Sequence, residues 1–190
     1  MNPPSLFDHL SGINGHLRAD MERSLVGWEN SPFAWIRQQP SRRVGAIGEA
    51  FARELLAQNG VLVTRPTSSE HDMITDGVRT EVKFSTLWET GRYKFQQIRD
   101  QVYDGALLLG LSPHQANAWY VPKTVLMQAW ASGQLVGQHG GGGAKETAWI
   151  EVIPSAPPAW LAPYGPTLDV ALRQLRALSA SRLSSRLTPD

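Results

Sequence analysis

The 190-residue chain contains no cysteine, which excludes disulfide scaffolds, cysteine nucleophiles and thiolate zinc sites. It has no apolar run approaching the roughly 20 residues of a membrane span, and its first residues carry no secretion signal. Its charges are nearly balanced, because 18 Lys and Arg residues and 17 Asp and Glu residues give a formal charge of +1. Tail-driven, strongly basic nucleic-acid binding is therefore excluded, and we expect a soluble cytoplasmic protein with no membrane partner.

Apolar residues are plentiful enough for a buried core. Hydrophobic residues make up 42% of the chain and charged residues 18%, and the length fits one domain with appendages. We expect a helical N-terminal extension over residues 1–43 and a core over residues 44–153. A proline-rich connector and a C-terminal helix are predicted over residues 154–190.

Helical and extended patterns alternate along the predicted core. This alternation predicts an α/β fold with a central mixed β-sheet flanked by helices. The spacing of Phe95, Ile98 and Val102 predicts a helix that follows the first three strands. The other predicted helices cover residues 44–58 and 123–132, and the predicted strands cover residues 61–63, 71–74, 78–85, 106–109, 118–121 and 147–153.

A hairpin is predicted in the first half of the core, where two extended runs meet at the Asp-Gly pair of residues 76–77. A two-residue loop at this pair places Asp72 opposite Glu81 on the neighbouring strand. Lys83 shares the face of Glu81, because side chains two positions apart on a strand point the same way. A one-residue slip of the register would move Asp72 to the other face.

Two carboxylates at this spacing repel each other unless a cation lies between them, and their hard oxygen atoms suit Mg²⁺, with Mn²⁺ as a substitute. Such a metal activates water and offsets charge on a phosphate, while a lysine orients the nucleophile or stabilises charge. The group predicts a site that hydrolyses phosphodiesters, with Asp72 and Glu81 as metal ligands and Lys83 as a catalytic partner.

Glu49 is the candidate for a third carboxylate. It lies on the predicted helix of residues 44–58, and we expect its small neighbours Gly45, Ala46 and Ala52 to let this side of the helix approach the sheet closely.

The order of Glu49 on a helix, then Asp72, then Glu81-Val82-Lys83 on the second strand of a hairpin resembles the PD-(D/E)XK nuclease superfamily. The resemblance covers residues 44–122 and implies a restriction-endonuclease-like αβββαβ core. It implies that Asp72 and Glu81 bind Mg²⁺, that Lys83 acts on the water or the phosphate, and that Glu49 assists. His71 stands where the family name has proline.

Within this superfamily a chain of this length most resembles a type II restriction endonuclease that cuts double-stranded DNA at a specific site. A Holliday-junction resolvase or a repair nuclease would use the same four residues and stays an alternative. A non-catalytic DNA-binding module is the alternative from another class. The structural alternative is a surface salt bridge between Lys83 and its acidic neighbours.

Basic residues interleaved with aromatics follow the predicted site, as a DNA backbone running past a metal would need. Trp88 and Tyr93 lie among them, and a solvated loop is the alternative interpretation. The weaker DNA-binding candidates are Arg92, Lys94, Arg99, His139 and Lys145.

A homodimer is predicted because one catalytic group cuts one strand, so cutting both strands in one encounter requires a second copy. The apolar stripes over residues 17–36 and 168–178 are the candidate interface. A monomer that nicks each strand in turn is the alternative.

Overall fold

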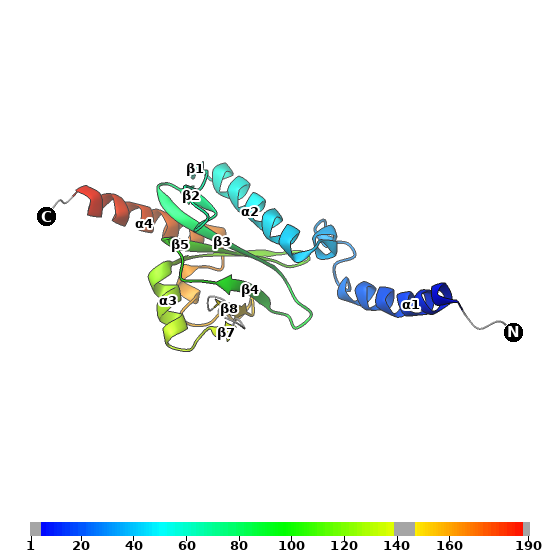
Figure 1. Cartoon of the computed structure of the whole chain (residues 1–190). Helices are drawn as coiled ribbons and strands as arrows, with labels where there is room; N and C mark the ends of the chain where they lie inside the picture. The colour runs from blue at the N-terminus through cyan, green and yellow to red at the C-terminus, as the bar shows by residue number, and fades with distance from the viewer. Residues whose placement is uncertain (1–4, 139–146, 188–190) are drawn as a thin grey trace.

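The computed structural model describes residues 5–138 and 147–187. It contains helices and strands in alternation, in an order close to that expected (Figure 1). In chain order they are α1 (Leu6–Ser24), the 3₁₀ helix η1 (Ala34–Gln38), α2 (Ser41–Gln58), β1 (Val63–Thr64), β2 (Met73–Thr75), β3 (Val78–Thr86), β4 (Tyr93–Ile98), β5 (Gly105–Leu111), β6 (Ala116–Pro122), α3 (Lys123–Ala131), β7 (Val136–Gln138), β8 (Thr147–Val152), the 3₁₀ helix η3 (Ala162–Tyr164) and α4 (Leu168–Leu187).

A five-stranded sheet with the order β1-β2-β3-β5-β6 forms the centre of the molecule. Strands β3 and β5 are parallel and the other neighbours are antiparallel, so the expected mixed sheet is confirmed. Helices α2 and α4 cover one face of this sheet. The other face is covered by α3 and by a second, three-stranded sheet with the order β4-β8-β7 (Figure 1).

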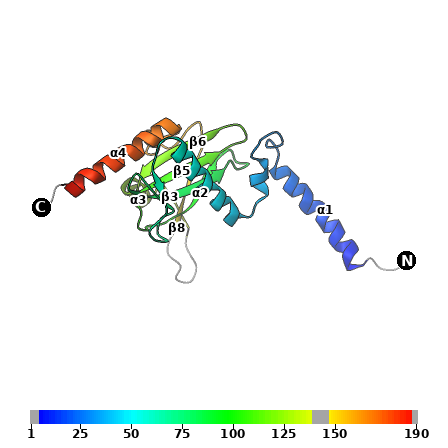
Figure 2. The ribbon, with the colours of Figure 1, turned by 90° about the horizontal axis from the view of Figure 1, so that it is seen from above.

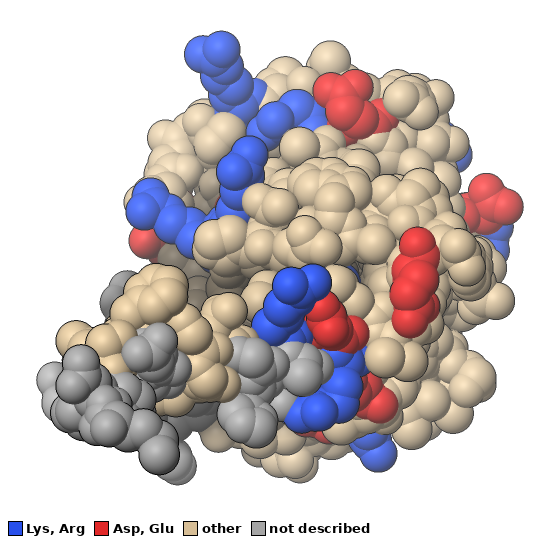
Figure 3. Space-filling model, turned by 90° about the vertical axis from the view of Figure 1, so that its right-hand side faces the viewer, with Lys and Arg blue, Asp and Glu red and all other residues tan. Residues whose placement is uncertain are grey.

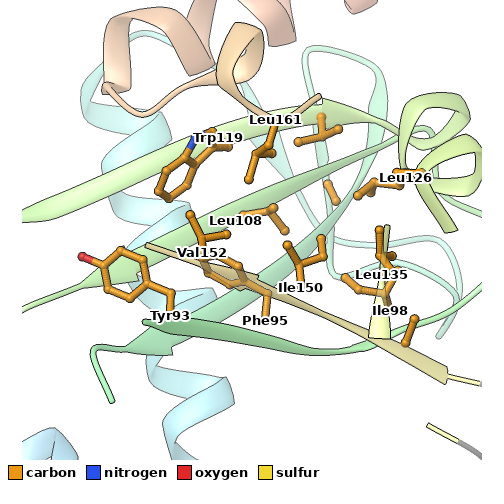
Figure 4. Packing of buried hydrophobic residues seen from close by; sticks show 14 of the residues in the cluster. Tyr93, Phe95, Ile98, Leu108, Trp119, Leu126, Leu135, Ile150, Val152 and Leu161 are labelled. Carbon is orange, nitrogen blue, oxygen red and sulfur yellow. The ribbon is translucent and has the colours of Figure 1, made fainter. Parts of the chain in front are cut away.

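The apolar run of β5 is buried along its whole length, because it lies in the middle of the central sheet with a layer on each face. Leu108 packs between the two sheets with Phe95, Trp119 and Ile150 (Figure 4). The rings of Phe95 and Trp119 meet edge to face, with centroids 6.1 Å apart. This core holds β4 against the central sheet, next to the candidate site.

The helix predicted from Phe95 is wrong, because residues Tyr93–Ile98 form strand β4. Tyr93, Phe95 and Ile98 are all buried against the central sheet, and a bulge between Phe95 and Ile98 produces their uneven spacing. That spacing imitates a helical stripe. The αβββαβ core implied by the resemblance has a helix after its third strand. This chain has strand β4 in that place.

The apolar stripe of α4 packs on its own sheet, in contrast to the expected role in a dimer interface. Leu172 and Leu175 are buried with Leu107 and Tyr120 of the central sheet. Ile36 of η1 is likewise fully buried in its own chain. Within the described part of these two stripes, the exposed large apolar side chains are Met21 on α1, which projects from the body of the molecule (Figure 2), and Val26 and Trp35 between α1 and α2. Among the described residues, no helix has the length and apolarity to cross a membrane.

Asp104 ties α4 to the start of β3. Its carboxylate accepts hydrogen bonds from Arg79 at 2.6 and 2.9 Å and forms an ion pair with Arg182 of α4. Burial raises the pKa of Asp104, but the hydrogen bonds from Arg79 and the charge of Arg182 outweigh burial and hold it below its ordinary value. The charged carboxylate thus stabilises the folded chain.

We expect Asp104→Asn to lower the free energy of unfolding by about 2 to 3 kcal/mol at neutral pH, because two arginines lose their shared partner. The folded-state pKa is lowered, so this stabilisation exists above the unfolded pKa of about 4 and disappears as the pH falls through the folded value. Urea denaturation of both proteins across this range measures the difference. If the difference in unfolding free energy between the two proteins stays constant as the pH falls into the acid range, the stabilising role of the Asp104 charge is contradicted.

Candidate functional site

A cleft of about 710 Å³ lies between the N-terminal half of α2 and strand β4, beside β3. The edge of β3 is open there because β2 pairs only with its first residues, up to Thr80, while β3 continues to Thr86. The cleft is lined by all four predicted catalytic residues, Glu49, Asp72, Glu81 and Lys83.

The predicted hairpin register is confirmed. Met73 pairs with Thr80, and the Asp-Gly pair at residues 76–77 forms the loop with φ of 48° and 81°. Positive φ at both positions is what a type I′ turn requires. Continuing the register by one residue places Asp72 opposite Glu81, and the Asp72 N–H donates to the Thr80 carbonyl at 3.1 Å.

The Asp72 side chain lies along the open edge of β3. Its Oδ2 accepts a hydrogen bond from the Val82 N–H at 2.7 Å, which would otherwise lack a strand partner. Among the described residues, no hydrogen bond engages the second oxygen, Oδ1. In an antiparallel pair the N–H and C=O of one residue point to the same edge, so the Val82 carbonyl also faces the cleft.

Glu81 and Lys83 form an ion pair with 2.7 Å between Oε1 and Nζ. Glu81 is 8% exposed, and burial raises its pKa above the ordinary value. Lys83 opposes this increase, while the negative charges of Asp72 and Glu49 add to it. The three carboxylates are thus close enough to repel one another. Lys83 offsets this repulsion at Glu81, so burial is the main cause of the raised pKa.

Glu49 is brought to the cleft by a close approach of α2 to β3 at Gly48. A Cβ atom at residue 48 would overlap the Cβ and Cγ atoms of Phe84 on β3. The expectation for Gly45 was wrong, because open space surrounds it, whereas Ala52 is buried as expected. Burial and the charge of Asp72 raise the pKa of Glu49, which places these two carboxylates within electrostatic reach.

We expect Gly48→Ala to lower the free energy of unfolding by about 1 to 3 kcal/mol, because α2 or Phe84 must shift to admit the methyl group. Gly45→Ala is the matched control on the same helix, and it should be neutral or stabilising by up to about 1 kcal/mol. Chemical denaturation of both variants measures the difference. Equal effects at the two positions would refute close packing at Gly48.

The predicted DNA-binding residues fall in different places. Lys94 lines the cleft, with its Nζ 4.5 Å from the ring centre of Trp88 and 3.2 Å from Glu151. Arg92 pairs with Glu151 at 3.7 Å at the start of β4, and neither Arg92 nor Arg99 lines the cleft. His139 and Lys145 lie outside the described residues.

Sequence reasoning missed several polar residues that line the cleft. Arg42 lies on the same side of α2 as Glu49, seven residues and about two turns away, so helical periodicity would have found it. Arg37 of η1 reaches the Leu87 carbonyl at 3.1 Å, a contact between segments 50 residues apart that no local pattern reveals. Gln96 and Gln97 were missed because a helix was predicted for the segment that forms β4.

On the face of the molecule seen from the α1 end, Lys and Arg side chains are interspersed with Asp and Glu side chains (Figure 3). Positive charge on this face is therefore confined to small areas around individual basic side chains.

The carboxylate and carbonyl oxygen atoms at the cleft are donors of the kind that Mg²⁺ prefers. Within the described residues, no three His, Cys, Asp or Glu side chains come together closely enough to hold a metal by themselves. Mg²⁺ does not need such a cage, since it keeps several waters and takes one or two carboxylates plus substrate phosphate oxygens. Asp72 and Glu81, with the Val82 carbonyl on the same edge, supply that kind of partial ligand set.

Comparison with known proteins gives a likeness in fold. No protein-family model matches the sequence, and no curated protein matches it. The structure of I-Ssp6803I, a bacterial homing endonuclease, is similar at a TM-score of 0.51 with 16% sequence identity. The similarity covers 77% of this chain and 98% of that one, so the chain shares the fold of this endonuclease over most of its length.

Proposed function

We propose that the chain is a Mg²⁺-dependent endonuclease that hydrolyses phosphodiester bonds of double-stranded DNA at a specific site, as a type II restriction endonuclease does. The observation that carries this proposal is the meeting of Glu49, Asp72, Glu81 and Lys83 in one cleft at the open edge of β3. This order of residues is that of the PD-(D/E)XK nucleases, and the likeness in fold to an endonuclease supports it independently.

In this proposal Asp72 and Glu81 hold the metal, which supplies a Lewis acid that activates water and offsets charge on the phosphate. Lys83, fixed by its ion pair with Glu81, orients the attacking water and faces the charge that develops on the phosphate. The Val82 N–H fixes the Asp72 carboxylate in place. Glu49 assists from α2 without being a direct ligand.

Lys94 is the DNA contact that the structure supports best. Its Nζ lies beside Trp88 at the cleft wall, which suits a phosphate of the strand next to the cleavage site. Arg92 and Arg99 lie on or beside the same strand, and we propose them as outer contacts to the backbone. Glu151 holds Lys94 and Arg92 in the absence of DNA.

Incubation of the purified protein with plasmid and phage DNA in Mg²⁺, followed by gel electrophoresis, tests the proposal. Several discrete fragments would support a restriction role, and a single rare cut would favour a homing role, the second candidate that the likeness to I-Ssp6803I introduces. Selective cutting of four-way junctions would favour a resolvase. A protein that binds DNA and leaves it intact would be the non-catalytic module.

We also propose that the enzyme acts as a homodimer through α1. Leu6, Leu10 and Ile13 form one stripe on α1 and are 74, 55 and 54% exposed. The helix projects away from the body (Figure 2), so its own chain leaves this stripe uncovered. A second copy of the same helix would cover it, and two copies would provide one catalytic group for each DNA strand.

We expect light scattering at micromolar concentration to give twice the chain mass of 20.9 kDa, and Leu10→Glu to give the monomer mass. Ser11→Glu, about 100° further around α1, is the matched control and should leave the dimer intact. A wild-type monomer both with and without DNA would rule out the dimer.

A further inference from the structure

Strand β4 carries a bulge formed by two glutamines. Phe95 pairs with Ile150 and Ile98 pairs with Ala148, so Gln96 and Gln97 together face the single residue between those partners, Trp149. An extra residue of this kind bends the strand and redirects its side chains, and such bulges are frequent beside active sites.

The bulge changes which side chains meet the solvent. In a regular strand Gln97 would follow Phe95 onto the buried face and Ile98 would point outward. With the bulge, Ile98 is 1% exposed in the core, and both glutamines are exposed. Gln97 has φ of 56°, a left-handed conformation that L-residues other than glycine, asparagine and aspartate rarely adopt.

Both glutamines line the same cleft as Glu81 and Lys83. They lie on β4, the edge strand of the three-stranded β4-β8-β7 sheet, and some DNA-binding proteins place the strands of a β-sheet in a groove of DNA to read bases. Among the described residues, no hydrogen bond occupies either side-chain amide. The two amides are therefore available to a ligand that lies in the cleft.

We propose that Gln96 and Gln97 read base edges in the major groove next to the cleaved phosphate, with a preference for adenine. A glutamine amide donates to adenine N7 and accepts from its N6 amino group, which makes adenine the base that it discriminates best. This inference rests on the proposed function, because it places DNA in the cleft.

The spacing along β4 agrees with this arrangement. Lys94 is the proposed phosphate contact, and Gln96 follows it two residues, or about 7 Å, along the strand. Successive nucleotides of one DNA strand are about 3.4 Å apart along the helix axis. The bases that the glutamines reach are therefore expected within about three positions of the phosphate that Lys94 holds.

A library of duplexes randomised around the cut site tests the proposal. The library is cleaved in Mg²⁺ and the ends are sequenced, and the same library is separated by gel shift without metal so that base preference is also read from binding. Wild-type protein should enrich adenine at one or two positions. Gln96→Ala and Gln97→Ala should each reduce that enrichment about tenfold at its own position while cleavage continues.

Gln97→Asn is a second variant that retains an amide and tolerates a positive φ, and it should also weaken the preference because its side chain is shorter. Gln128→Ala, at an exposed glutamine of α3 outside the cleft, is the matched control and should leave the profile unchanged. If all Gln96 and Gln97 variants cleave DNA with the same base preference as the wild type, the inference is overturned and the proposed nuclease function is unaffected. If the wild-type protein does not cleave DNA but enriches adenine in the gel shift, and the Gln96 and Gln97 variants lose that enrichment, the proposed nuclease function is overturned and the inference is supported. A wild-type profile without adenine enrichment in either readout would also overturn the inference.

Discussion

Glu81→Gln and Lys83→Met are each expected to lower the rate of DNA cleavage at least about a thousandfold, while DNA affinity changes by no more than several-fold. The first removes a metal ligand, and the second removes the charge that faces the water and the phosphate. Because burial and neighbouring carboxylates raise the pKa of Glu81, its charged form is unfavourable in the folded protein. Glu81→Gln should therefore keep or raise the melting temperature while it abolishes cleavage.

Single-turnover cleavage under excess enzyme, with gel shifts on the same DNA, separates the effects on chemistry and on binding. Glu54→Gln removes an exposed carboxylate of α2 outside the cleft, and it serves as the matched control with full activity. Glu49→Gln should lose less activity than Glu81→Gln, because its proposed role is indirect. Full activity in the Glu81 variant would contradict the mechanism.

Removal of the metal is expected to abolish cleavage and to weaken DNA binding, because Asp72, Glu81 and Glu49 then face the phosphates as uncompensated negative charges. Addition of Mg²⁺ or Mn²⁺ should restore both. Asp72→Asn removes one of these charges, so in a chelator this variant should bind DNA several-fold more tightly than the wild type. Gel shifts in a chelator and in Mg²⁺ measure both proteins.

Glu54→Gln again provides the control, since it also removes one carboxylate charge, but at a position outside the cleft. Equal tightening of DNA binding by both variants would show a general effect of net charge. Cleavage that persists in excess chelator would contradict a metal-dependent site.

The hairpin could be predicted from the sequence because its information is local. The Asp-Gly pair at residues 76–77 dictates a type I′ turn, and this turn sets the register that places Asp72 opposite Glu81. The burial of β5 was equally readable, since a continuous apolar run is typical of a strand buried on both faces.

Strand β4 could not be predicted in the same way. Phe95 and Ile98 are three residues apart, which fits a helix as well as a strand with one inserted residue. Pairing with β8, about 50 residues further along the chain, decides between the two conformations, and such distant pairing leaves no local pattern.

The walls of the cleft likewise depend on contacts between distant segments. Gly48 could be recognised as the close-approach residue only once Phe84 was known to lie opposite it. Arg37 reaches the cleft because η1 packs beside the end of β3. The motif residues of the site were therefore readable from the sequence, whereas the side chains that surround them were not.

The central claim is that Asp72 and Glu81 share one divalent ion at the open edge of β3. Crystals of the protein soaked in Mn²⁺ test it most directly, because the anomalous signal locates the metal without assumptions about activity. We expect a peak at about 2 Å from a carboxylate oxygen of each residue, with water completing the coordination. A peak at another place, or none at saturating Mn²⁺ with the Glu81–Lys83 ion pair intact, would contradict the account.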